Sequence, residues 1–281
     1  MAVKIVTGSL SDITSDLAQE LGITVVPLTV TFGHESFLDR VTMTTEEFYY
    51  RLEHDPNWPV TTQPPPGTFI EVYNKLAEET DEILVIVLSS KLSGTYQSAT
   101  NAKNLIEKKC RIEVIDSLKV AMSLGLVVIA AAKIAQAGAG LDEVIAAVNE
   151  RLPRSHLIVY LDTLKYLAKG GRIGKAQGLL GSLLSVKPIL TIKDGEMSPL
   201  TRVRTKAAGM DYVYNFVAGF PHIEELAVEH ATTPDDADRL VERLSSLFPK
   251  ERIYRSTASP VIGTYAGPNA LAVSVLEAGK E

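Results

Sequence analysis

The sequence predicts an α/β protein, and three observations predict this class. In the first half, short β-rich runs alternate with helical patterns, as they do in parallel βα units. One of those runs, 83–88, is continuously apolar, which is typical of a strand buried on both faces of a sheet. After Pro153 the order of elements changes, and Asp194-Gly195 marks a hairpin turn between two expected strands.

Local signals at the ends of the elements predict the first half. Gly22 stands where glycine commonly ends a helix, and Thr44 followed by Glu47 is typical of a capped helix start. Apolar residues at helical spacing run from Leu141 to Leu152. The expected strands are 3–7, 24–30, 83–88 and 112–115, and the expected helices are 11–21, one from 44, one from about 66, 93–108, 119–138 and 141–152.

The second half is expected to pack closely on the first, because no repeat or low-complexity linker separates them. We place the boundary at Pro153, which divides the chain into domains 1–153 and 154–281. In the second domain the expected strands are 156–161, 186–192, 197–203, 226–230, 261–265 and 271–276, and the expected helices are 204–217 and 234–247.

The composition excludes several classes of protein. Of the 281 residues, 46% are hydrophobic and 22% are charged, which suits a globular protein with a sizeable core. The formal charge of 28 − 34 = −6 argues against binding to nucleic acid or to an anionic membrane surface. The single cysteine, Cys110, excludes a disulfide framework. The longest apolar run, 120–132, is shorter than the roughly 20 residues that span a membrane, so we expect a cytoplasmic protein without stable membrane insertion.

Three loops place hydroxyl groups or free backbone amides beside the end of a strand or helix. In the first, 60–67, three consecutive prolines keep Thr61 and Thr62 in a stiff extended loop. These threonines are either ligand donors or the cap of the helix that starts near Pro66.

The second loop, 89–98, follows the buried strand 83–88. Ligands of parallel α/β sheets bind beyond the carboxyl ends of strands, where helix N-termini favour anions. Ser93 is placed to cap the next helix and Gly94 lets backbone approach a ligand, although a serine cap needs no ligand. The loop matches neither the P-loop nor the GxGxxG pattern, so nucleotide binding is not predicted.

The third loop, 167–174, carries paired glycines followed by Arg172, which predicts an exposed turn with a forked cation or a plain surface loop. Arg202 and Arg204 flank Val203 on an expected strand. Alternate residues share one face, so both arginines either face one anion or are solvated on an edge strand.

The common catalytic and metal-binding motifs are missing from the sequence. The five histidines show no HExxH spacing, so no metal site is predicted. No GxSxG motif, which would mark a serine nucleophile, occurs. A nucleophilic Ser93 would need a neighbouring base, and Lys91 is the nearby candidate. Asp162, Asp211 and Glu229 have no paired spacing and are expected to be solvated.

Together these loops resemble the DegV family of bacterial fatty-acid-binding proteins, in an order that runs along nearly the whole chain. The resemblance implies a Rossmann-like N-terminal domain with a parallel sheet and a smaller α/β C-terminal domain with a mixed sheet, with the ligand between them. The matching segments are 5–9, 47–49, 61–64, 93–99, 116–117, 170–173, 187–189 and 263–268.

The resemblance also implies a function. A carrier of this family holds a long-chain fatty acid such as palmitate or oleate, without a cofactor, and presents its carboxylate to the catalytic subunit of a fatty acid kinase. The product is an acyl phosphate for phospholipid synthesis. Arg172 would lie on the kinase-facing surface. The residues that match the carboxylate site or stand at its positions are Thr61, Thr62, Ser93, Gly94, Tyr265, Arg202 and Arg204.

The sequence departs from the family pattern at two positions. Gly8 precedes Ser9 where the family has Asp-Ser, and Tyr265 stands where the family has histidine. Tyrosine keeps a hydroxyl donor but does not become a cation near neutral pH.

A fatty acid needs an apolar tunnel and a set of donors for its carboxylate. About 14 buried methylenes contribute roughly 11 kcal/mol before entropy costs, and uncharged hydroxyls and helix-start amides can replace the water around the carboxylate. We expect a binding protein; the alternatives are a small-molecule enzyme that uses Ser93 or Tyr265 in the same cleft, and an interaction module without a pocket. The expected tunnel lining, equally compatible with ordinary core, is Leu179, Leu180, Leu183, Leu184, Ile189, Leu190, Leu226 and Val228.

Overall fold

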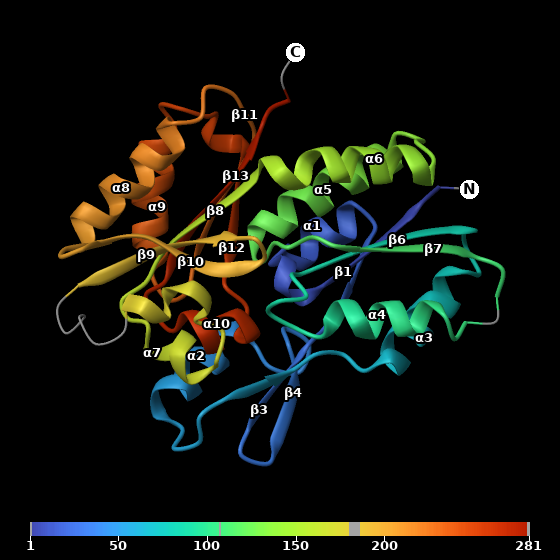
Figure 1. Ribbon diagram of the computed structural model, residues 1–281, viewed down its shortest axis with the longest axis horizontal. Helices are drawn as coiled ribbons and strands as arrows, with labels where there is room; N and C mark the ends of the chain where they lie inside the picture. The colour runs from blue at the N-terminus through green and yellow to red at the C-terminus, as the bar shows by residue number, and fades with distance from the viewer. Residues whose placement is uncertain (1, 107, 180–185, 280–281) are drawn as a thin grey trace.

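The computed structural model describes residues 2–106, 108–179 and 186–279, and its strands form three sheets (Figure 1). The first sheet is parallel with the strand order β2-β1-β6-β7. Its strands are β1 (Lys4–Gly8), β2 (Ile23–Val26), β6 (Glu82–Val87) and β7 (Arg111–Asp116).

Helices cover both faces of the parallel sheet (Figure 1). Alternate residues of β6 point to opposite faces, so Val85 packs with α3 and α4 while Leu84 packs with α5. Burial on both faces explains why 83–88 is apolar throughout. The helices of this half are α1 (Ser15–Glu20), α3 (Pro66–Leu76), α4 (Thr95–Lys103), α5 (Met122–Gln136) and α6 (Leu141–Arg151), with 3-10 turns η1 (Ser9–Ser11) and η2 (Leu152–Arg154).

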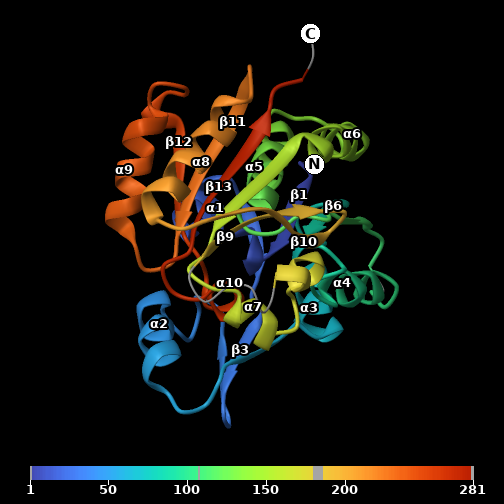
Figure 2. The same cartoon turned by 60° about the vertical axis from the view of Figure 1, so that its left-hand side comes forward.

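The second sheet is mixed, with the order β10-β9-β8-β13-β11-β12, and all of its strands follow Pro153 in the chain. Helices α8 (Lys206–Ala218) and α9 (Pro234–Leu244) cover its outer face, and α5 packs against its inner face, between the two large sheets (Figure 2). The strands are β8 (Ser155–Tyr160), β9 (Lys187–Lys193), β10 (Glu196–Val203), β11 (Ile223–His230), β12 (Ile253–Thr257) and β13 (Leu271–Glu277).

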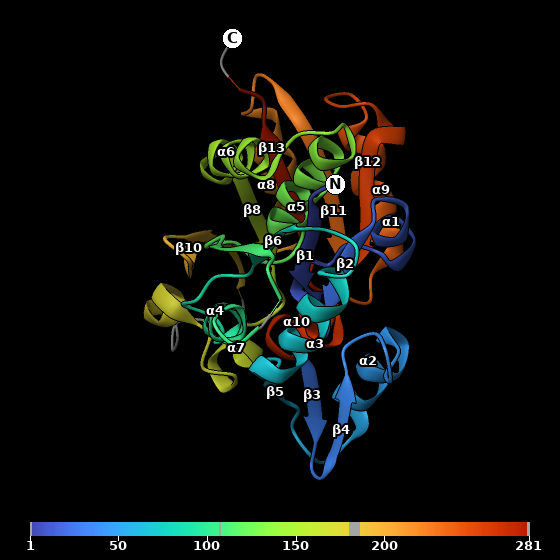
Figure 3. The same ribbon diagram turned by 90° about the vertical axis from the view of Figure 1, so that its right-hand side faces the viewer.

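A small antiparallel sheet, β4-β3-β5, stands at one end of the molecule (Figure 3). It consists of β3 (Thr29–Phe32), β4 (Glu35–Leu38) and β5 (Val60–Thr62). Helix α10 (Pro260–Ala266) comes from the second half but packs on β3, β5 and α2 (Thr45–His54) of the first half. The remaining short elements are α7 (Lys165–Lys169), η3 (Gly174–Leu179) and η4 (Lys250–Arg252).

The predicted α/β class is confirmed, with a parallel sheet from the first half and a mixed sheet from the second. The expected helix after Thr44 is also confirmed, because the Thr44 side chain accepts a hydrogen bond from Glu47 N. The hairpin at Asp194-Gly195 joins β9 to β10 as predicted.

Two expected elements are wrong. The single strand 24–30 is two strands in different sheets, because Pro27 interrupts the run and offers no N–H to a ladder. The expected strand 261–265 is helix α10, whose Ser259 cap and Pro260 start outweigh the β-branched residues that follow.

Other boundaries differ by a few residues. Helix α4 begins at Thr95 with Gly94 as its N-cap residue, so Ser93 does not cap it. Helix α1 begins at Ser15 behind a Thr14 cap and a 3-10 turn. Among the described residues, no helix combines the length and the apolar character that crossing a membrane requires.

Candidate functional site

A cavity lies between the two large sheets and is lined mostly by apolar side chains. The cavity volume is about 110 Å³. Its walls include Leu10, Leu88, Val120, Leu157 and Val261. Such a lining favours a hydrocarbon ligand over a polar one.

The segments that follow three neighbouring strands of the parallel sheet form one wall of this cavity. Leu10, Leu88 and Val120 follow β1, β6 and β7, which are neighbouring strands of that sheet. Their carboxyl ends meet at one edge, where ligands of parallel sheets bind. The second sheet supplies the facing wall through Leu157 of β8 and Ala272 of β13.

Small side chains keep this space open. Five alanines line the cavity, where larger apolar residues would fill it, namely Ala121, Ala258, Ala266, Ala270 and Ala272. Met197 of β10 closes one side. The adjoining hairpin tip is fixed to the β6–α4 loop, because Ser89 Oγ donates to Gly195 O at 2.8 Å.

Polar side chains from distant parts of the chain gather at one place in the lining. They are Thr61 of β5, Gln63 directly after β5, Ser93, Arg172 and Tyr265. The Thr61 and Tyr265 hydroxyls are hydrogen-bonded to each other, and Ser93 Oγ lies 2.9 Å from Thr95 Oγ1. This cluster provides three hydroxyl groups beside an apolar space.

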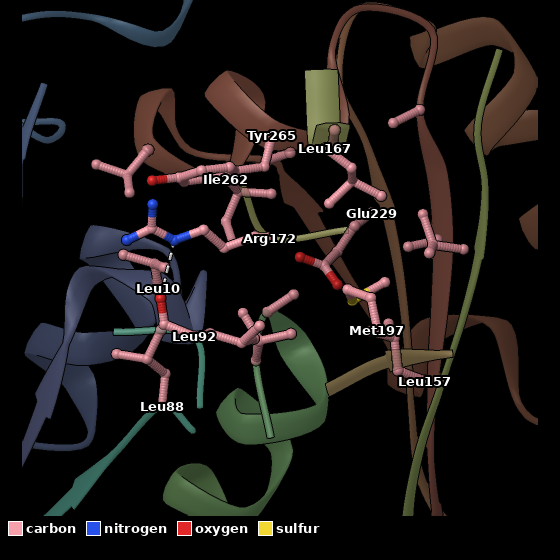
Figure 4. A pocket seen from close by; sticks show the side chains of 18 of the residues that line it. Leu10, Leu88, Leu92, Leu157, Leu167, Arg172, Met197, Glu229, Ile262 and Tyr265 are labelled. Atoms are coloured by element: carbon pink, nitrogen blue, oxygen red, sulfur yellow. Dashed lines mark hydrogen bonds between the residues drawn. The ribbon is translucent and has the colours of Figure 1, made fainter. Parts of the chain in front are cut away.

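Arg172 lies between Tyr265 and Leu92 (Figure 4). Its guanidinium carbon is 5.3 Å from the centre of the Tyr265 ring, within cation–π range. Nε donates to Leu92 O at 3.2 Å and Nη1 to Gly170 O at 2.9 Å. Arg172 is exposed and also belongs to the lining, so we call this end of the cavity its mouth.

The structure brings together only some of the residues predicted for the site. Thr61, Ser93, Arg172 and Tyr265 line the cavity. Thr62 is exposed, because successive residues of β5 point to opposite faces and Thr61 takes the inward position.

Gly94, Arg202 and Arg204 also lie outside the lining. A Cβ on Gly94 would stand 3.0 Å from Gln63 Nε2, so the missing side chain makes room for Gln63. Arg202 lies at the opposite end of β10 from Met197, Arg204 follows that strand, and both are exposed.

The expected tunnel lining is wrong for the residues that the structure describes. Ile189, Leu226 and Val228 pack under α8 and α9, on the outer face of the mixed sheet. Leu179 and Leu190 contribute to the core without lining the cavity. A one-residue change of register exchanges the faces of a strand, and apolar character alone does not reveal which face is inside. Leu180, Leu183 and Leu184 fall outside the described residues.

Sequence reasoning missed the role of Glu229, which was expected to be solvated. The side chain is only 2% exposed and forms part of the cavity wall (Figure 4). Burial and the nearby Asp12 carboxyl raise its pKa well above the ordinary value. An acidic residue directly after the apolar residues 226–228 of an expected strand was the signal that could have revealed it.

Glu229 belongs to a buried charged cluster next to the cavity. Asp12 and Asp39 are 0% and 1% exposed, and Arg40 donates to Asp12 Oδ1 at 2.8 Å. Burial raises the pKa of Asp39 to about 6. Arg40 Nη2 also donates to Thr257 O, which ties the first half of the chain to the end of β12.

Comparisons with known proteins agree with this architecture. The model of the DegV family, a family of uncharacterised proteins, matches residues 2–278. A DegV domain-containing protein of Caldanaerobacter subterraneus subsp. tengcongensis is 39% identical over 274 residues, covering 96% of this chain and 97% of that protein.

Two solved structures share the fold over nearly their whole length. A fatty-acid-binding DegV family protein from Thermus thermophilus is 32% identical with a TM-score of 0.90, covering 99% of this chain and 100% of that chain. DegV of Bacillus subtilis, a fatty acid binding protein, is 29% identical with a TM-score of 0.88 and the same coverage. The resemblance of the loops is thus confirmed along the chain, and the chain belongs to the DegV family.

Proposed function

We propose that this protein binds a long-chain fatty acid such as palmitate or oleate in the cavity between its two large sheets. The observation that carries the proposal is the composition of the cavity lining, which is mostly apolar and has three hydroxyls and one arginine at its mouth. The acyl chain would occupy the apolar part, and the carboxylate would lie at the mouth.

The energetics favour this orientation. Each methylene that leaves water contributes about 0.8 kcal/mol, so a long acyl chain gains more than the donors at the mouth can supply. The carboxylate would replace the bond between the Thr61 and Tyr265 hydroxyls and accept from both, with Ser93 as a third donor. Arg172 provides the nearby positive charge.

Relatives with the same fold support the ligand class. The Thermus thermophilus and Bacillus subtilis proteins bind fatty acids, and both are covered completely by the match to this chain.

We further propose that the protein is a cytoplasmic carrier that presents the fatty acid carboxylate to a fatty acid kinase. The exposed position of Arg172 beside the mouth supports such an encounter, because a partner that reaches the carboxylate would also meet this residue. Incubation with the kinase, ATP and loaded protein should yield acyl phosphate, and Arg172→Ala should slow its formation.

A role as an enzyme in its own right has less support. In the part of the chain that the structure describes, Ser93 Oγ is hydrogen-bonded to Thr95 and to no histidine, lysine or carboxylate that could activate it.

Thr61 and Thr62 provide a matched test of the ligand site. Thr61→Val removes a hydroxyl at the mouth, whereas Thr62→Val removes one that faces solvent on the same strand. We expect Thr61→Val to weaken palmitate and oleate binding by about 1–3 kcal/mol and Thr62→Val to leave it unchanged, measured by fluorescence competition or native mass spectrometry. Equal affinities of the two variants would place the carboxylate elsewhere.

A further inference from the structure

Two buried carboxyl groups from opposite halves of the chain lie together beside the cavity, and one of them, Glu229, lines it. Asp12 follows the 3-10 turn η1, and Glu229 lies on β11 of the mixed sheet. Their side chains are 0% and 2% exposed and interact electrostatically with each other. Ser256 pairs with Glu229 between β11 and β12 and donates its Oγ to Asp12 O. The ligand site proposed above makes no use of this pair.

One oxygen of each carboxyl group has donors. Asp12 Oδ1 accepts from Arg40 Nη2 at 2.8 Å and from Ser259 N at 3.3 Å. Glu229 Oε2 accepts from Met122 N at 3.0 Å. If both groups were ionised, the other oxygens, Asp12 Oδ2 and Glu229 Oε1, would be buried acceptors without a donor among the described residues.

The surrounding charges do not offset two ionised carboxylates. Among the residues that the structure describes, Arg40 is the cation that faces the pair, and it binds Asp12 directly. Asp39, from the loop before α2, and the phenol of Tyr49, from α2, are the other titratable groups that face this cluster. Two unscreened negative charges in contact are unfavourable in a buried site, and a single proton between them supplies the missing donor for both oxygens.

We propose that Asp12 and Glu229 share one proton, carried by Glu229, and that the pair positions the cavity wall for the acyl chain. Asp12 keeps its charge because Arg40 and Ser259 N bind it. Glu229 O–H then donates to Asp12, and Glu229 presents no net charge to the apolar ligand.

The pair connects two segments that contribute to the wall. Met122 N, which donates to Glu229, begins α5 directly after the lining residues Val120 and Ala121. Ser259 N, which donates to Asp12, precedes α10, which carries Val261 and Tyr265 into the lining. The contribution to ligand binding rests on the proposed function, whereas the shared proton does not.

Infrared spectroscopy tests the proton directly. At pH 8, where Asp39 is ionised, the wild-type protein should show the carbonyl band of a buried carboxylic acid. The band should be absent in Glu229→Gln and present in the control Asp39→Asn. A wild-type protein without this band, or a band that persists unchanged in Glu229→Gln, would overturn the proposal, whether or not the protein binds fatty acids.

Two substitutions at Glu229 separate hydrogen bonding from volume. Glutamine keeps a donor for Asp12 and an acceptor for Met122 N, whereas methionine fills similar space with neither. We expect Glu229→Gln to bind palmitate within about threefold of wild type and Glu229→Met to lose at least tenfold. Equal binding by both variants would contradict the positioning role. If Glu229→Met does not fold, the infrared comparison still shows whether Glu229 carries the proton.

Discussion

At the mouth of the cavity, tyrosine takes the place at which the family resemblance leads us to expect histidine. Tyr265 comes from α10 and its hydroxyl meets Thr61 from β5, two residues far apart in the sequence. A phenol donates a hydrogen bond to a carboxylate without adding positive charge. The head-group site therefore depends on Arg172 for its cation.

This difference predicts a pH response that can be introduced by one substitution. Tyr265→His should bind fatty acid more tightly as the pH falls through about 6.5, because the protonated imidazole gains an attraction to the ligand carboxylate. Titrations of both proteins between pH 6 and 8 would check this. The same pH profile for the variant and the wild type would show that residue 265 does not face the carboxylate.

Asp39 predicts a pH dependence of stability. Burial raises its pKa from 3.8 to about 6, so the folded state holds this proton more tightly than the unfolded chain does. The stabilisation from this group is complete below about pH 4 and is lost as the pH rises through 6, up to about 3 kcal/mol in all.

Denaturant unfolding of wild type and Asp39→Asn, from pH 4 to 7.5, isolates that contribution from other acidic groups. The unfolding free energy of wild type minus that of the variant should decrease as the pH rises. A constant difference would show that Asp39 has an ordinary pKa.

At the scale of the element, side-chain alternation along a strand decides which residues reach the cavity. The sequence indicated that the loop 60–67 and the strand 226–230 contribute to the ligand site, but it did not indicate which of their side chains point inward. Thr61 lines the cavity while Thr62 is exposed, and Glu229 lines it while Val228 packs under the outer helices. Both faces of β11 are buried, so hydrophobicity does not indicate which face points to the cavity.

The turn into α5 contains a strained residue at the cavity. Ala121 has φ 57° and ψ −153°, a conformation that is essentially restricted to glycine, and its N–H donates to Leu10 O at 2.8 Å. Ala121→Gly should relieve about 1–3 kcal/mol of strain against roughly 0.5–1 kcal/mol of added chain entropy, and so raise the unfolding free energy.

The matched control is Ala131→Gly, within helix α5, which should lower the unfolding free energy by about 1 kcal/mol or more. Chemical denaturation of both variants checks the pair. A loss of stability in Ala121→Gly similar to that in Ala131→Gly would show that residue 121 is not strained.

At the scale of the whole molecule, the site depends on segments that cross between the two halves. Local signals predicted the α/β class, the capped helix after Thr44 and the hairpin at Asp194-Gly195. They did not predict that α10 returns to pack on β3, β5 and α2, because such long-range packing leaves no pattern in neighbouring residues. The buried cluster of Asp12, Arg40 and Glu229 was missed for the same reason.

The measurement that tests the account most directly is native mass spectrometry of wild type and Ala272→Phe with added palmitate or oleate. Ala272 lies on the inner face of β13, where a phenyl ring would fill the cavity. Wild type should bind one fatty acid per chain, and the folded variant, verified by circular dichroism, should bind none. Unchanged binding by Ala272→Phe, or no binding by wild type, would contradict the claim that the acyl chain lies between the two sheets.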